Sequence, residues 1–376
     1  MKIPAVAYRP DGSPGPGALS EVELDVAEIR ESALMMPGLL VVDVRGGAGL
    51  DRRYGDLRFD PAGGGGPLAT PRDRRESIGF GIVNVAYHLR RSLDYLASLT
   101  HHELPPLIAR IGAHGDQRAR WGGGHYRLPA VVYSSLPETP PPAVTGEIHL
   151  GPGGTFTQAA GRRYFVAPAH VVAIIVHELG HHLTRHTADF RLNERRLPLA
   201  QANHKIPLDE GTADYLAAIM LGTPDIYGWH RGGTPPAAQA RRRLDGAWTM
   251  AAFRGGHDTD PHLDGTVWAA ALWSARRAVR ASGGQAAEFD RLVAEGLVRI
   301  GATHPEMPDE VVRHRRRSFG DALAAILESD AARGGRFGDV IAAAFADRGI
   351  EAGFSNADLR DRCRVLPCRA PVRPLR

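Results

Sequence analysis

The stretch VVAIIVHELGHHLTRH, residues 171–186, sets the organisation of this chain. Its first six residues are aliphatic or alanine, so the segment is expected to pack in a core, yet His177, Glu178 and His181 follow directly. On an α-helix, His177 and His181 lie one turn apart and project from the same face. Because ionisable side chains in an apolar setting need partners, the stretch predicts a packed helix that carries a polar site.

The H-E-x-x-H spacing of these residues is typical of a zinc site. Zinc takes neutral imidazole nitrogens at about 2.0–2.1 Å, and a catalytic site keeps one position for water. Glu178 lies about 100° round the helix from His177, so its carboxylate can face that water and take its proton. We therefore predict His177 and His181 as ligands and Glu178 as general base. The alternative is an ordinary helix with surface histidines, which the aliphatic run argues against.

A third ligand has to come from elsewhere in the chain. The residues after His181 lack the glycine and histidine of the metzincin spacing, which excludes that subclass. The better candidate is Glu210 in LDEGTADYLAA, residues 208–218, with Asp214 one turn further along the same helix face. A carboxylate at Asp214 can accept the second N–H of a ligating histidine and set its tautomer. The alternative for Glu210 is a first-turn acid that favours the helix dipole.

Composition indicates a globular protein. The chain has 376 residues, 43% of them hydrophobic, which allows a substantial core and two or three lobes. The net charge is only +4, and the arginine cluster at Arg313–Arg317 has no recognition motif beside it, so nucleic-acid binding is not expected. The longest apolar run is too short to cross a membrane, and the N-terminus lacks a secretory signal. We expect a cytoplasmic protein; secretion after a removed leader stays open.

Periodicity and glycine or proline breaks predict an α+β fold with four parts. Residues 1–75 form strands, loops and a glycine-rich linker, and residues 76–188 form a lobe that ends in the histidine helix. Residues 189–352 form a helical lobe, and residues 353–376 form an arginine-rich tail. A cleft is expected between the two lobes.

Individual elements follow from the same patterns. A long helix is expected at residues 76–99, and strands are expected at LLVVDV, PPLIARIGA, LPAVVYSSL and GEIHLG (residues 39–44, 105–113, 128–136 and 146–151). Helices after the histidine helix are expected to be capped by Asp209 and Asp264 and to stop at Gly222 and Gly283. Two further helices are expected at residues 320–335 and 337–350.

The chain resembles the gluzincin clan of zinc metallopeptidases in two segments, HELGH (residues 177–181) and DEGTADY (residues 209–215). Within this clan, the fungalysin-like and thermolysin-like families are nearest. DPHLDGTVWAAALW, residues 260–273, is similar to a fungalysin segment, and IAAAFADRGI, residues 341–350, is similar to that family's closing helix. The resemblance covers residues 80–350, approximately. It implies a zincin-type two-lobe fold with one catalytic zinc ion in the cleft.

The resemblance also implies roles for single residues. It makes His177, His181 and Glu210 the metal ligands and Glu178 the general base. Asp214 becomes the carboxylate that accepts the second N–H of a ligating histidine. His262 matches the histidine that donates to the oxyanion, where a placed donor contributes about 3 kcal/mol. The alternative for His262 is a plain loop histidine after Pro261, and either Asp258 or Asp260 is a candidate to orient it.

Other features depart from the family pattern or stay open. Thermolysin-like enzymes have a tyrosine in the spacer as a second oxyanion donor, whereas residues 182–209 contain none, and neither Tyr215 nor Tyr227 can be assigned. GEIHLG is the candidate for the edge strand that binds extended substrate. The remaining histidines, including the two at positions 182 and 186 and the pair at 101 and 102, are expected at the surface.

These observations predict a zinc-dependent metallopeptidase that hydrolyses peptide bonds with a zinc-bound water activated by Glu178. Its partner would be a peptide or protein substrate. Two alternatives are a zinc hydrolase that tailors one dedicated biosynthetic substrate and a non-catalytic zincin module that binds peptides. The sequence leaves open the substrate, the cleavage preference, endo- or exopeptidase action, the oligomeric state and whether Cys363 and Cys368 pair.

Overall fold

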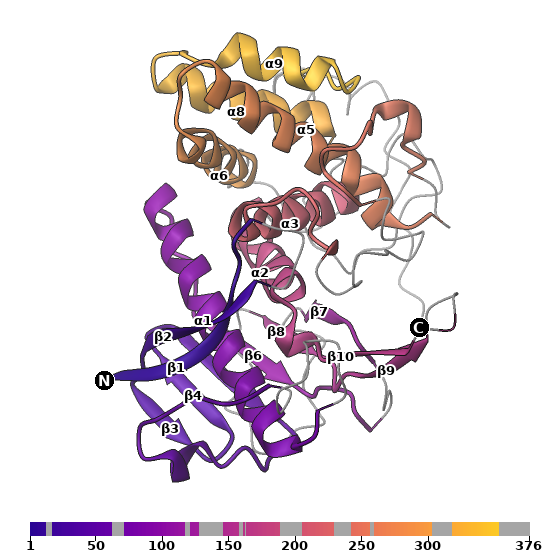
Figure 1. Cartoon of the computed structure of the whole chain (residues 1–376). Coiled ribbons are helices and arrows are strands. Elements are labelled where there is room, and N and C mark those ends of the chain that lie inside the picture. The colour runs from indigo at the N-terminus through magenta and orange to yellow at the C-terminus, as the bar shows by residue number, and fades with distance from the viewer. Residues whose placement is uncertain are drawn as a thin grey trace, which may run out of the picture.

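A computed structural model confirms the α+β fold, with a mixed sheet in the N-terminal half and a mostly helical C-terminal half (Figure 1). It describes residues 1–12, 17–61, 71–116, 121–127, 146–157, 161, 163–188, 205–228, 242–255, 259–302 and 318–352. Several predicted features lie outside these residues, namely the strand at 128–136, the glycine run at 63–66, Asp258, the cluster Arg313–Arg317, and Cys363 with Cys368. The predicted domain boundaries stay predictions.

A six-stranded sheet with the order β3-β4-β5-β6-β8-β7 forms the N-terminal half. Its strands are β3 (Glu28–Arg30), β4 (Ala33–Met36), β5 (Leu39–Asp43), β6 (Leu107–Ile111), β8 (Glu147–Leu150) and β7 (Gly124–Arg127). The strands β5, β6 and β8 run parallel, and the other pairs are antiparallel. Parallel strands are usually covered on both faces, which explains why β6 and β8 are buried along their whole length.

The predicted edge strand is wrong. GEIHLG contains β8, which pairs with β6 on one side and with β7 on the other. β3 and β7 are the two edge strands of the described sheet. β7 is the edge strand next to β8; it opens on a glycine and has the short sequence GHYR. Glycine weakens strand propensity, so the hydrophobic pattern did not reveal this strand.

Two smaller antiparallel pairs complete the strands of the described chain. The first joins β1 (Lys2–Arg9) to β2 (Ala18–Asp25), and the second joins β9 (Gly154–Thr157) to β10 (Arg163–Val166). β1 packs against the first helix, so the N-terminal pair extends the core of the sheet.

Helix α1 (Arg74–Leu99) confirms the predicted long helix and begins two residues earlier. Asp73 caps it, because its side chain accepts the backbone N–H groups of Arg75 and Glu76. The helix packs against β1, β4 and β5 and also contacts the histidine helix. Its apolar face therefore joins the sheet to the helix that carries the site.

The histidine helix α2 (Val172–His186) is the junction of the two halves (Figure 1). It contacts α1, β7 and β8 on the N-terminal side and α3 (Lys205–Leu221) on the C-terminal side. The contact with α3 is close at Gly180, where an added Cβ would lie 2.4 Å from the Cα of Ala213. Only glycine fits there, so the two backbones approach far enough for their side chains to share one site.

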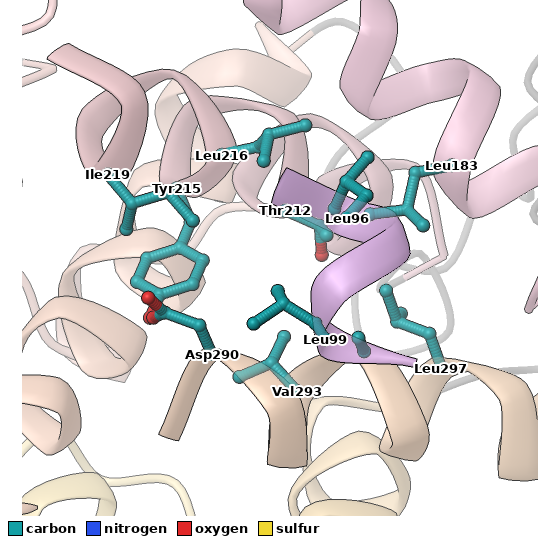
Figure 2. A pocket seen from close by; sticks show the side chains of 11 residues that line it. Leu96, Leu99, Leu183, Thr212, Tyr215, Leu216, Ile219, Asp290, Val293 and Leu297 are labelled. Carbon is teal, nitrogen blue, oxygen red and sulfur yellow. The ribbon is translucent and has the colours of Figure 1, made fainter. Parts of the chain in front are cut away.

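The C-terminal half consists of packed helices: α3, α5 (Pro261–Ala281), α6 (Ala286–Ala302), α8 (Phe319–Ala332) and α9 (Gly338–Ala346). α3 and α5 also pack closely, because a Cβ at Gly211 would lie 2.3 Å from the carbonyl oxygen of Gly265. A small apolar cavity between α1, α3 and α6 is lined by residues such as Leu96, Leu216 and Val293 (Figure 2). Its lining residues on α3 lie on the helix face opposite Glu210.

Two predicted helix starts are wrong. α3 begins at Lys205, so Asp209 lies inside the helix, although Gly222 ends it as predicted with a φ of 74°. α5 is capped by Asp260, and Asp264 lies in its first turn, where it accepts the backbone N–H groups of Arg254 and Gly255. In both cases the predicted cap has a tertiary partner instead. α8 and α9 match the predicted helices, whereas α6 was not predicted.

None of the helices in the described residues is both long and apolar enough to span a membrane.

Candidate metal centre

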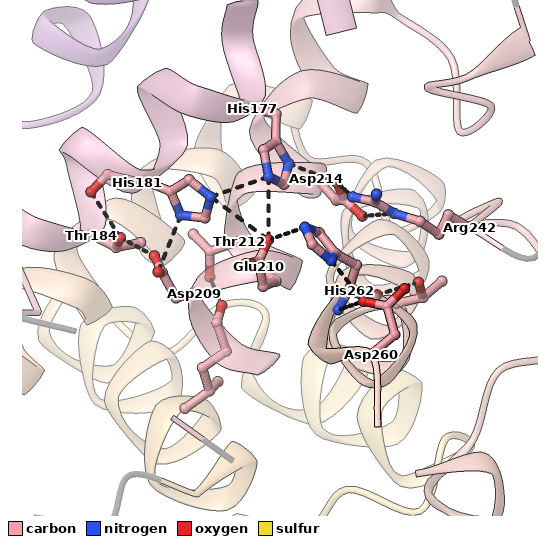
Figure 3. Close-up of polar contacts among 12 residues, drawn as sticks. His177, His181, Thr184, Asp209, Glu210, Thr212, Asp214, Arg242, Asp260 and His262 are labelled. Atoms are coloured by element: carbon pink, nitrogen blue, oxygen red, sulfur yellow. Dashed lines mark hydrogen bonds and ion pairs between the residues drawn. The ribbon is translucent and has the colours of Figure 1, made fainter. Parts of the chain in front are cut away.

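His177, His181 and Glu210 form a buried group that can hold a metal ion (Figure 3). The Nε2 atoms of the two histidines are 3.1 Å apart, and Glu210 Oε2 lies 3.2 Å from His177 Nε2 and 3.6 Å from His181 Nε2. A tetrahedral zinc ion with ligands at about 2.0–2.1 Å separates its ligand atoms by about 3.3 Å. The three atoms thus have the spacing of ligands around one ion.

The close packing of three helices brings these side chains together. His177 and His181 lie one turn apart on α2, and Glu210 faces them from α3. On its other side Glu210 meets α5, where an added Cβ on Gly265 would lie 3.1 Å from the Cβ of Glu210. The position of the carboxylate is therefore set by glycines at both helix contacts.

Each histidine of the group has a carboxylate behind it. His177 Nδ1 is 2.8 Å from Asp214 Oδ1, and His181 Nδ1 is 3.1 Å from Asp209 Oδ2. At His177 this hydrogen bond holds the ring proton on Nδ1 and leaves the Nε2 lone pair directed at the group. The contact of His181 with Asp209 has the distance of an ion pair, without the geometry of a hydrogen bond in the described residues. Asp214 lies beside a ligating histidine as predicted, whereas the position of Asp209 was not predicted, because an acid near an expected helix start also has the residue type of a helix cap.

Arg242 holds Asp214 from the side opposite His177. Its guanidinium donates to both oxygens of Asp214, with distances of 3.1 Å and 2.6 Å, and lies 4.6 Å from the centre of the Tyr227 ring. Burial alone would raise the pKa of Asp214, but Arg242 and His177 outweigh it and lower that pKa. Sequence reasoning missed Arg242, because it belongs to a run of three arginines in an arginine-rich chain.

The site is rich in negative charge. Burial lowers the pKa of His177, but Asp214 and Glu210 outweigh it and raise that pKa to about 10. The pKa of His181 is raised to about 9 in the same way, against its burial, by Asp209 and Glu210. Imidazoles that attract protons so strongly mark a pocket that favours a cation.

Glu210 itself provides the test of whether an ion fits. Its Oε2 atom lies within 3.6 Å of imidazole nitrogens of both α2 histidines, yet it accepts no hydrogen bond of normal geometry from the described residues. Buried polar atoms in native proteins are almost always satisfied. A divalent ion bound to Glu210 and the two imidazoles would satisfy this atom, so the donor set fits a metal.

Glu178 lies beside the group and is also buried. Its Oε2 atom has no hydrogen-bond partner among the described residues. On the other side of the carboxylate is the edge strand, because a Cβ on Gly124 would lie 2.9 Å from Glu178 Oε1. Burial raises the pKa of Glu178, and the nearby histidines only partly offset this. The side chain is thus a buried acceptor between the group and β7.

His262 lies in the first turn of α5, next to the same group. Its Nε2 atom is 3.1 Å from Glu210 Oε2, and its Nδ1 atom is 2.7 Å from Asp260 Oδ1. The side chain is 38% exposed, whereas those of the three grouped residues are at most 10% exposed. His262 therefore stands at the solvent side of the site, and Asp260 orients it.

The structure also places Tyr215, which the sequence left unassigned, and the histidines outside the metal group. Tyr215 donates to Asp290 on α6, which places its hydroxyl group away from the metal group. The expectation of a surface position is wrong for His88, His149, His170 and His182, which are all buried. His182 contacts the Tyr126 hydroxyl at 3.1 Å and the carbonyl oxygen of Pro105 at 3.1 Å. The helix face that His182 occupies is covered by the strand β7, which the sequence did not reveal.

Comparison with known proteins adds no family to this picture. Neither a scan against models of protein families nor a search of curated proteins gives a match for this chain. The function therefore has to be argued from the geometry of the site.

Proposed function

We propose that this protein is a zinc-dependent metallopeptidase with a single active site at the metal centre. The observation that carries the proposal is the buried group of His177, His181 and Glu210 with the carboxylate of Glu178 next to it. Two imidazoles and one carboxylate are a common ligand set of catalytic zinc, which supplies Lewis-acid polarisation of a carbonyl and activation of water.

The general base is Glu178. A buried carboxylate with a raised pKa is a stronger base than one in water, and it can take a proton from a water molecule and return it to a leaving amine. It has one oxygen without a hydrogen-bond partner in the described structure, so this atom is available to accept that proton.

His262 is placed to stabilise negative charge on the substrate. Asp260 at its Nδ1 atom orients the ring so that Nε2 faces the site, where a proton on Nε2 would donate to the substrate. Charge develops on the carbonyl oxygen during amide hydrolysis, and a pre-placed donor there contributes about 3–4 kcal/mol.

The edge strand β7 favours an extended peptide as substrate. β7 ends the described part of the sheet on this side, and the addition of a strand at a sheet edge is a common mode of peptide binding. Gly124 of β7 lies against Glu178, so a peptide that paired with this edge would pass beside the general base. This feature supports a peptidase over a hydrolase of small molecules.

The test is the variant Glu178→Gln, compared with wild type for zinc content and for cleavage of a peptide library. We expect zinc to be retained and cleavage to fall by about 10²–10⁴-fold, because proton transfer is lost. Glu328→Gln, on an exposed position of α8, is the control and should cleave like wild type. Retained zinc with unchanged cleavage in Glu178→Gln would contradict the proposed base. Failure of the wild type to cleave any library peptide would favour a dedicated substrate or a binding module.

A further inference from the structure

A second histidine cluster lies on the other side of the edge strand. His114, His125 and His149 each offer one ring nitrogen, and these three atoms all lie within 4.8 Å of one another. In β7, Gly124 faces Glu178 and Tyr126 contacts His182, both on α2. Since successive side chains of a strand point to opposite faces, His125 points away from α2.

Strand pairing places the second histidine beside the first. His125 and His149 are direct partners in the antiparallel pair of β7 and β8, and their ring centres are 5.4 Å apart. The third ring, that of His114, lies 5.0 Å from the ring of His125 and 5.1 Å from that of His149. The three rings thus surround one common point on this face of the sheet.

A buried ion pair sets the tautomer of His149. Arg110 donates to both oxygens of Glu147 at 2.6 Å and 2.8 Å, which keeps this carboxylate ionised. His149 Nε2 is 3.0 Å from Glu147 Oε2 and donates its proton there. The lone pair of His149 Nδ1 is then directed at the cluster, in the arrangement that ligating histidines usually adopt.

His114 reaches the cluster from a strained backbone. Its Nε2 atom is 3.0 Å from His149 Nδ1, close to the separation of about 3.3 Å between two ligands of one tetrahedral ion. Its φ is 60°, in the left-handed region that residues other than glycine seldom adopt. Such strain persists where the surroundings enforce it, and it is common at ligand sites.

We propose that His114, His125 and His149 bind a second divalent transition-metal ion, distinct from the ion at His177, His181 and Glu210. Three neutral imidazoles suit zinc, copper, nickel or cobalt, whereas magnesium and calcium require oxygen ligands. The ion joins the turn after β6 to β7 and β8. Because Gly124 of β7 lies against Glu178, the ion also holds the strand that borders the first site.

The proposal is tested by counting ions, which does not depend on any peptidase activity. Wild type and two double variants, His177→Gln with His181→Gln and His114→Gln with His125→Gln, are loaded with zinc, dialysed and measured by native mass spectrometry. We expect two ions in wild type and one in each double variant. His101→Gln, at an exposed histidine, is the control and should retain two. One ion in wild type that persists in His114→Gln with His125→Gln would overturn the proposal.

Fluorescence gives a second readout that locates the ion. The ring of Trp121 lies 5.0 Å from that of His125 and 5.7 Å from that of His114, so a paramagnetic ion in the cluster should quench it. In the background His177→Gln with His181→Gln, we expect one equivalent of Cu²⁺ to quench, and Trp121→Phe to remove most of that quenching. Equal quenching with and without Trp121, in variants whose far-ultraviolet circular dichroism matches wild type, would contradict this location.

Discussion

Asp209 and Asp214 lie behind two different histidines of the metal group. Each places a carboxylate oxygen at the Nδ1 atom of one ring, at 3.1 Å for His181 and 2.8 Å for His177. They differ in their own support, because Asp214 is held by Arg242 whereas Asp209 accepts a hydrogen bond from Thr184. The sequence thus predicted a position beside a ligating histidine for Asp214 but not for Asp209.

Removing either charge should weaken metal binding without abolishing it. We expect Asp209→Asn and Asp214→Asn each to reduce zinc affinity by about 10–100-fold, because the amide no longer holds the imidazole proton as strongly. Competition with a chelator of known affinity measures this change. Asp94→Asn, at an exposed position of α1, is the matched control. An unchanged affinity in Asp209→Asn would show that its contact with His181 has no influence on the ion.

At the scale of elements, close contacts between helices build the site. α2 and α3 approach at Gly180, and α3 and α5 approach at Gly211 and Gly265. These contacts bring His181, Glu210 and His262 into one place from three helices. The edge strand β7 then separates the two histidine clusters, so one strand borders both candidate metal sites.

Gly180→Ala should damage stability and metal binding together. The added Cβ would lie 2.4 Å from the Cα and 2.7 Å from the Cβ of Ala213, so the two helices must move apart. Overpacking of this kind costs about 1–3 kcal/mol, and the shift also separates His181 from Glu210. Denaturant unfolding measures the free energy of unfolding, and zinc titration measures the affinity. A variant that lost stability but kept wild-type affinity would contradict the idea that this contact positions the ligands.

At the scale of the whole molecule, buried neutral histidines make the fold sensitive to acid. Burial lowers the pKa of His88 to about 3 and that of His170 to about 4. Their Nε2 atoms donate to the carbonyl oxygens of Tyr8 and Ser77. In the unfolded chain these rings take up protons near pH 6.5, so unfolding becomes more favourable as the pH falls below that value.

The contribution of His88 can be isolated by a difference measurement. Between pH 6.5 and about 3, the pKa of His88 in the folded protein, the ring is protonated only in the unfolded chain. The free energy of unfolding therefore falls by up to about 1.4 kcal/mol for each pH unit of acidification. We therefore expect the free energy of unfolding of wild type to fall, relative to that of His88→Gln, as the pH falls from 7 to 5. Urea unfolding at several pH values provides the measurement. A difference that did not change with pH would show that the His88 ring takes up its proton at the same pH in the folded protein as in the unfolded chain.

Local patterns predicted much of the fold and the centre of the site. The long helix α1, the histidine helix, the parallel strands β5 and β6 and the two last helices follow from periodicity and caps. The predictions failed where tertiary contacts compete with local preference. Asp209 and Asp264 have the residue type of a helix cap, but each accepts a hydrogen bond from a residue outside its own helix. The edge strand β7 is short and contains glycine, so its pattern was too weak to detect.

The spacing of four residues between His177 and His181 was by itself enough to place both rings on one face of α2, because an α-helix repeats about every 3.6 residues. Which carboxylates meet those rings depends on how α2, α3 and α5 cross, and close packing at glycines controls those crossings. His114, His125 and His149 come together only through strand order and register, since β8 lies between β6 and β7. Strand order is a long-range property, and no local pattern contains it.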